Sequence, residues 1–112
     1  MAGYNGNGAF VLPRALRIKN GVNVETLAIA RTLSLTDSMV QLLDNSTGGA
    51  LDVTLPDYKE GAIFAIKSTG TAALTLKRQS SSVIGSLAAG EGALLVCTGS
   101  AASSDWVIVI KA

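Results

Sequence analysis

The chain has 112 residues, enough for one domain, and it is 48% hydrophobic but only 4% aromatic and 15% charged. Its nine lysines and arginines are scattered along the sequence and its net charge is +1, which argues against nucleic-acid binding and against a polybasic membrane anchor. Histidine is absent, so Ser-His-Asp and Cys-His catalysis are excluded, and a mean hydropathy of +0.42 indicates that partners cover part of the apolar surface.

The N-terminal segment is rich in glycine and asparagine and carries few apolar side chains. We therefore predict a flexible arm over residues 1–12, followed by a single domain over residues 13–112. The arm holds two of the five aromatic residues, and two arginines follow it directly. Tyrosine and arginine are favoured interface anchors, so we predict that this region binds a protein surface; the alternative is a terminus without a binding role. The predicted interface residues are Tyr4, Phe10, Arg14 and Arg17.

Short alternating segments with turn signals between them occupy the rest of the chain. Apolar and polar residues alternate on both sides of Asn20-Gly21, which predicts a β-hairpin. Further strands are predicted at residues 32–35, 39–43, 51–55, 62–67, 74–77, 83–84, 93–98 and 106–110. No long stretch shows helical periodicity, and no internal repeat is strong enough to indicate a solenoid. The predicted fold is all-β, an antiparallel β-sandwich or small barrel of jelly-roll type with about eight strands.

The alternation also predicts the core. The side chains expected there are Leu55, Phe64, Leu76, Val96 and Ile108. Trp106 is expected to share the core face of the last strand with Ile108 and Ile110, although a tryptophan at the rim of a β-sandwich could instead stack on a sugar. The lone Cys97 has no disulfide partner, and we expect it to be a small buried residue.

We find no residues with a catalytic, cofactor-binding or metal-binding pattern, and we predict that the protein is not an enzyme. Most of the eight acidic residues fall in predicted turns, where carboxylates bind backbone amides; a glycosidase-like pair stays open as an alternative. The segment Asp44-Asn45-Ser46 lacks the spaced carboxylates of a calcium loop. The glycine pairs around Asn7 and Glu91 are not followed by a helix, so neither predicts a phosphate cradle.

A series of short segments from about Thr32 to Ile110 carries a resemblance to a known group of proteins. These segments are Leu51-Asp52-Val53-Thr54-Leu55-Pro56, Gly61-Ala62-Ile63-Phe64-Ala65-Ile66-Lys67, Gly70, Leu74-Thr75-Leu76, Ile84-Gly85, Gly90-Glu91 and Asp105-Trp106-Val107-Ile108. Their order resembles small β-modules of tailed-bacteriophage structural proteins, which occur in capsid decoration (cement) proteins and in fibre or spike modules. The shared motifs are strand and turn chemistry, without a catalytic signature.

The resemblance implies a virion structural protein. A short chain with an arm and without a coiled coil favours a capsid decoration protein. Such a protein binds and stabilises the outer surface of the assembled capsid. The expected location is the outer capsid surface of the virion, which assembles in the host cytoplasm. The implied partners are the major capsid protein and further copies of the chain in a dimer or trimer, with no nucleic acid and no membrane. The alternatives are a tail fibre, spike or baseplate β-module, and a carbohydrate-binding jelly roll.

Overall fold

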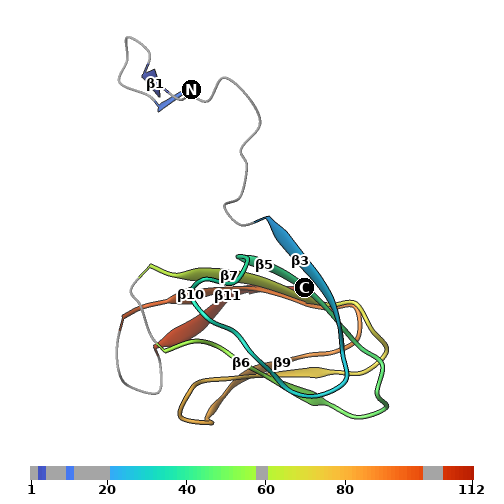
Figure 1. Ribbon diagram of the computed structural model, residues 1–112. Coiled ribbons are helices and arrows are strands. Elements are labelled where there is room, and N and C mark those ends of the chain that lie inside the picture. The colour runs from blue at the N-terminus through green and yellow to red at the C-terminus, as the bar shows by residue number, and fades with distance from the viewer. Residues whose placement is uncertain (1–2, 5–9, 12–20, 58–60, 100–104) are drawn as a thin grey trace.

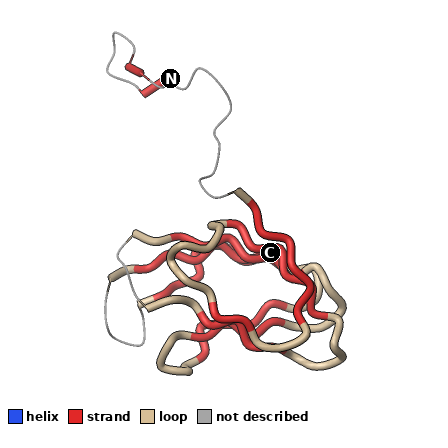
Figure 2. The backbone as a smooth tube through the Cα atoms, viewed as in Figure 1, coloured by secondary structure: helices blue, strands red, loops and turns tan. Residues whose placement is uncertain are grey.

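The computed structural model describes residues 3–4, 10–11, 21–57, 61–99 and 105–112 (Figure 1). These residues form β-strands joined by turns, and none of them belongs to a helix long and apolar enough to cross a bilayer. Near the N-terminus, β1 (Gly3–Tyr4) and β2 (Phe10–Val11) pair in antiparallel fashion. The other strands form two mixed sheets that lie one above the other (Figure 2).

The larger sheet has five strands of six residues each, in the order β11-β10-β7-β5-β3. They are β3 (Val22–Leu27), β5 (Val40–Asn45), β7 (Ile63–Ser68), β10 (Gly92–Cys97) and β11 (Trp106–Lys111). The smaller sheet has four strands in the order β4-β6-β8-β9. They are β4 (Arg31–Thr32), β6 (Leu51–Thr54), β8 (Leu74–Lys77) and β9 (Val83–Leu87).

From β3 to β8 the chain alternates between the two sheets, so each consecutive pair of strands forms one coil. Strands β3, β5 and β7 are parallel, with Val22 beside Val40 and Val40 beside Ala65. Strands β4, β6 and β8 are likewise parallel. Three coils therefore stack in register, as in a short solenoid. The last three strands add in antiparallel fashion, β9 to β8, β10 to β7 and β11 to β10.

The predicted antiparallel sandwich or small barrel of jelly-roll type is therefore wrong, because the two sheets are mixed and contain parallel strands. Alternation with a period of two is the same in parallel and antiparallel strands, so it could not give the strand direction. The turns carry the chain across to the other sheet instead of back beside the preceding strand. Gly21 does adopt a positive φ of 67°, but the preceding half of the predicted hairpin lies outside the described residues, and β3 pairs with β5 in parallel.

The core between the two sheets consists of apolar side chains from both. Leu55, Phe64 and Leu76 are buried as predicted, and Ile108 packs partly buried against them. The prediction for Val96 is wrong: it lies opposite Ile63 and Val107 on the outer side of the sheet. Since β10 is apolar at consecutive positions, alternation could not identify its inner face.

Trp106 is a core residue, as predicted, and it is only 1% exposed. Its indole Nε1 donates a hydrogen bond to the carbonyl oxygen of Pro56 at 3.1 Å, and its ring lies 5.9 Å from that of Phe64. Cys97 is buried, as expected. Ile110, however, is 61% exposed, because an irregularity in the β10–β11 register lets one residue of β11 bulge out and turns Ile110 to the outer side.

Candidate functional site

The predicted interface residues fall mostly outside the part of the chain that can be described. Tyr4 and Phe10 are opposite each other in the β1–β2 pair, but only their backbone is described. Arg14 and Arg17 lie outside the described residues. None of these four side chains is among those that the structure describes, so their role in binding stays a prediction.

Five acidic residues of the described segments form ion pairs: Glu25, Asp37, Asp52, Glu91 and Asp105. Within these segments no group of three potential metal-ligating side chains comes together. Glu25 and Asp37 both bind Arg31, through Nε to Oε1 at 3.2 Å and Nη2 to Oδ1 at 3.4 Å. The side-chain amide of Asn23 donates to Glu25 at 3.0 Å, and this hydrogen bond, with help from Arg31, lowers the pKa of Glu25. This carboxylate is held in its ionised form, which suits an ion pair and not a general acid.

A second charged cluster holds the last strand in place. Arg78, just after β8, donates from Nε to Asp105 Oδ1 at 2.8 Å and from Nη2 to the carbonyl oxygen of Trp106 at 3.0 Å. The same carboxylate oxygen accepts the Trp106 backbone N–H at 2.8 Å. Both charged side chains are nearly buried, at 11% and 12% exposed. The cluster ties the start of β11 to the turn between β8 and β9, and we assign it a structural role.

The outer face of the five-stranded sheet is the most unusual surface of the described molecule. We use the term outer face for the outward-pointing apolar side chains of its five strands: Val22, Val24, Val40, Leu42, Ile63, Ala65, Leu94, Val96, Val107 and Ile110. In register, Val22 lies beside Val40, Val40 beside Ala65, Ala65 beside Leu94, and Leu94 beside Ile110. One apolar row thus runs across the whole sheet from edge to edge.

The outward side of the four-stranded sheet provides an internal comparison. Asp52 lies beside Thr75, which lies beside Ser86, and Thr54 lies beside Lys77. Lys77 Nζ also bonds Asp52 Oδ2 at 2.9 Å. Polar side chains of this kind are what a sheet exposed to water carries, whereas apolar side chains on both faces are typical of a sheet covered on both sides. The same molecule therefore has one sheet built to face water and one built to be covered.

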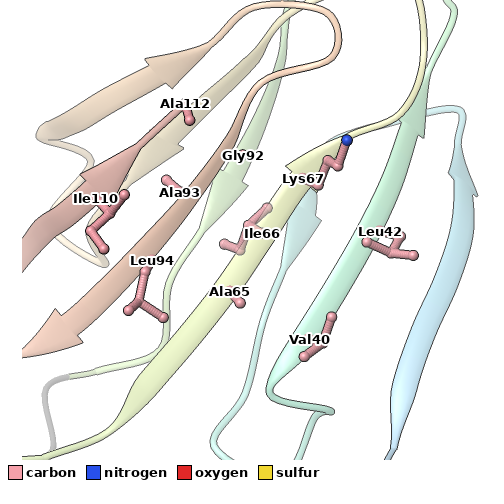
Figure 3. A pocket seen from close by; sticks show the side chains of 10 residues that line it. All are labelled: Val40, Leu42, Ala65, Ile66, Lys67, Gly92, Ala93, Leu94, Ile110 and Ala112. Atoms are coloured by element: carbon pink, nitrogen blue, oxygen red, sulfur yellow. The ribbon is translucent and has the colours of Figure 1, made fainter.

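A shallow groove of about 340 Å³ runs along the outer face (Figure 3). Val40 and Leu42 of β5 line one side, and Leu94 and Ile110 of β10 and β11 line the other. The groove exists because the strands between them carry small residues, including Ala65 and Gly92 on the outer side. An apolar surface of this kind gains about 25 cal/mol for each Å² that a partner removes from water, so the outer face is a candidate protein-binding surface.

Sequence reasoning missed this surface, although a signal for it is present. Residues 93–97 of β10 and 106–110 of β11 are apolar without alternation. Uninterrupted apolar strands indicate burial on both faces. Reading these two strands as covered on both sides would have pointed to an apolar outer surface, even with the wrong strand direction.

Comparison with known proteins adds information about the fold. No family model matches the chain, and no curated protein matches it in sequence. Among solved structures, one described as the structure of a chaperone-substrate complex is similar, with a TM-score of 0.53 and 15% sequence identity. The match covers 99% of this chain and 20% of the other, so this chain spans about a fifth of that chain's length. At this level of identity the likeness shows the fold alone.

Proposed function

We propose that this protein is a structural module that binds other protein surfaces, acting as a decoration protein on the outside of a bacteriophage capsid. The observation that supports this is the contrast between the apolar outer face and the polar side of the four-stranded sheet. An apolar sheet face of this width marks a site of protein interaction. A protein that binds only the assembled shell stabilises that shell by mass action, without any chemical reaction.

The virion setting rests on the resemblance of the chain to small β-modules of tailed bacteriophages. The segments that carry the resemblance include β6, β7 and β8, which form part of the coil stack. In this proposal the partner is the major capsid protein, and the contact with it is made by the N-terminal region with Tyr4, Phe10, Arg14 and Arg17. Many copies on a symmetric shell would multiply modest contacts through avidity.

The test uses capsids of the bacteriophage that encodes the chain, prepared without this protein. The full chain and a variant lacking residues 1–12 are each mixed with capsids and sedimented. We expect the full chain to co-sediment and to add density on the outer capsid surface, and the truncated chain to keep its β-sheet circular dichroism but to attach much more weakly. Failure of the full chain to bind at any capsid concentration would contradict the decoration function. Equal binding of the truncated chain would exclude the arm as the anchor.

A spike, fibre or baseplate module is a second candidate, favoured by the parallel coils. Stacked parallel coils are a quasi-one-dimensional architecture that suits rod-shaped assemblies. Electron cryo-microscopy of virions separates the two candidates, because density on the tail would support this one and density on the shell the first. Carbohydrate binding by a rim tryptophan finds no support, since Trp106 is buried in the core.

A further inference from the structure

We propose that copies of this chain associate with one another through the outer face of the five-stranded sheet, so that these faces meet inside a homo-oligomer. The inference deepens the proposed function by naming what covers the outer face, and it rests on that proposal only in treating the face as a protein-binding surface. It does not require a capsid. Three features of the described residues support it: the extent of the apolar surface, its area and its charge.

The apolar surface continues to both edges of the sheet. Val24 on β3 is 76% exposed, and Ile110 on β11, at the opposite edge, is 61% exposed. Between them, β5, β7 and β10 contribute further apolar side chains in register. An occupant that covers this surface must therefore be as broad as the sheet itself. A single helix or extended peptide would leave one edge in water, whereas a second sheet of the same width covers it all.

The area agrees with this size requirement. Five strands spaced about 4.8 Å apart and six residues long at about 3.3 Å per residue give a flat area of roughly 480 Å² for each copy. Two such faces in contact bury roughly 960 Å², close to the lower limit of about 1,000 Å² for a specific protein interface. Two copies of the outer face therefore supply an area at the lower limit of a specific contact.

The charges on this side of the sheet are balanced. Lys67 on β7 lies beside Leu42, and Asp44 follows two residues later on β5, pointing to the same side of the sheet. Among the described residues, this one cation and one anion leave the side chains on this side of the sheet without net charge. In a two-fold contact each copy presents the same patch, so a surface with excess charge would repel itself. This balance favours a second copy over a strongly acidic or basic partner.

Association through the β3 edge of the sheet is less favourable than association through the face. The edge strand β3 places Asn23 and Glu25 on its inner side, beside Gln41 and Leu43. Glu25 is also held by Arg31 at 3.2 Å. Inward-pointing charged residues on an edge strand are a common protection against strand addition by another chain. The copies are thus expected to meet face to face and not along β3.

The test compares the mass of the full-length protein with that of charge-insertion variants. Val24→Glu and Ile110→Glu each place a carboxylate on the outer face, and Val83→Glu is the matched control, because Val83 is 57% exposed on the outward side of the four-stranded sheet. Sedimentation equilibrium over a wide concentration range should give a dimer for the unmodified chain and the control. We expect the two outer-face variants to associate at least about a hundredfold more weakly, because each new charge enters a symmetric contact more than once.

Two results would overturn this inference: a monomer for the unmodified chain at every concentration, or outer-face variants that associate as well as the control. Val24→Thr and Ile110→Thr keep the β-branched shape that suits a strand, and they should give a smaller loss of association if the glutamate variants fail to fold. Capsid binding is measured separately. An oligomer that ignores capsids would contradict the decoration function alone, and a capsid-binding monomer would contradict this inference alone.

Discussion

Asp105 and Trp106 attach the last strand to the rest of the molecule through neighbouring polar and apolar contacts. The Asp105 carboxylate accepts from Arg78 and from the Trp106 backbone, while the Trp106 indole reaches Pro56 and packs against Phe64. The ion pair between Arg78 and Asp105 is nearly buried, so water cannot replace either charged side chain as a partner for the other. The strand is therefore positioned by side-chain chemistry as well as by its hydrogen bonds to β10.

We predict that Arg78→Met destabilises the protein by roughly 3 kcal/mol, because it leaves the Asp105 carboxylate nearly buried without its cation. Lys77→Met is the control, since Lys77 pairs with Asp52 at 27% and 44% exposure and such surface pairs contribute about 0–1 kcal/mol. Urea unfolding of both variants measures the difference. Equal losses in the two variants would show that the Arg78 pair behaves as a surface pair.

We predict that Phe64→Ala lowers the free energy of unfolding by about 3–5 kcal/mol. Phe64 is 3% exposed and contacts the Trp106 ring, so its removal leaves a cavity between the two sheets. Ile63→Ala, on the adjacent but 40% exposed position, should cost clearly less. Chemical denaturation gives both values. A loss below about 1 kcal/mol for Phe64→Ala would mean that the inner and outer sides of β7 are reversed.

The core positions show how far sequence could reach at the residue scale. Leu55 and Leu76 follow polar neighbours in alternating segments, and they were predicted correctly, as was Phe64 between Ile63 and Ala65. Val96 failed because Leu94, Leu95 and Val96 are all apolar, and alternation then gives no inner side. Ile110 failed because the bulge in β11 changes the side of the sheet on which its later residues lie, and nothing in a run of isoleucine and valine reveals a bulge.

At the scale of elements, β3 belongs to the first coil and carries two polar residues, Asn23 and Glu25, on its inner side. Asn23 donates from Nδ2 to Gln41 Oε1 at 2.7 Å, and Glu25 binds both Asn23 and Arg31. Terminal units of a stacked fold need such a polar ending, because no further coil covers them. The ion pair between Glu25 and Arg31 also joins β3 to β4, and hence joins the two sheets within the first coil.

We predict that the contribution of Glu25 to stability is lost in acid. Its hydrogen bond from Asn23, supported by Arg31, lowers its pKa below the ordinary value of 4.5, so the ionised form is favoured in the folded state. Such a contribution is present above pH 4.5 and disappears as the pH falls through the lowered pKa. Glu25→Gln should therefore be less stable than the unmodified chain at neutral pH, and the gap should shrink on acidification. A gap that widens in acid would contradict the assignment.

The corners of successive coils also stack directly. In the turn after β7, Thr69 N–H donates to the carbonyl oxygen of Leu43 at 3.0 Å and Ala72 N–H donates to that of Asn45 at 2.8 Å. The Asn45 side chain, fully buried, donates in turn to the carbonyl oxygen of Ala73 at 2.7 Å. Gly70 lies so close to the Asn45 backbone that a Cβ there would overlap with it.

We predict that Gly70→Ala costs about 1–3 kcal/mol, because the methyl group meets backbone atoms of the preceding coil that cannot turn aside as a side chain can. Gly49→Ala is the control, since Gly49 lies in open space in the preceding turn and has no positive φ. Thermal or urea unfolding distinguishes the two variants. A Gly70→Ala variant as stable as the control would show that the two corners are further apart than the structure places them.

Sequence predicted most strand positions but not which strands pair. The predicted segments 51–55, 74–77, 93–98 and 106–110 correspond closely to β6, β8, β10 and β11. Strand pairing depends on whether each turn returns the chain to the same sheet or leads it to the other sheet. The turns around Asp37 and Asn45 carry ordinary turn residues, and these residue types do not distinguish the two cases. The outer face could not be predicted for the same reason, because its position depends on which apolar strands are neighbours.

At the scale of the whole molecule, the three coils and the C-terminal strands share one core. Leu27 and Leu33 belong to the first coil, Leu43 and Val53 to the second, and all belong to the same buried cluster as Trp106. Stacked repeats with independent cores can unfold one after another, whereas elements that share a core unfold together. The size of the chain, close to that of a single small domain, also favours one cooperative transition.

We predict that urea unfolding followed by Trp106 fluorescence coincides with unfolding followed by far-UV circular dichroism. Trp106 is the single tryptophan and reports on the junction of β11 with the core, while circular dichroism reports on strands throughout the molecule, β3 and β5 included. If the first coil separated from the rest, the dichroism would change at lower urea than the fluorescence, since β3 lies at the far edge of the sheet from β11.

Association through the outer face, as we propose, would in addition move both curves to higher urea as the protein concentration rises, because oligomerisation stabilises the folded chain by mass action. Glu25→Gln, which weakens the first coil alone, is the sharpest check on the shared core: it should lower both midpoints together, and two curves that separate in this variant would show that the coils unfold independently.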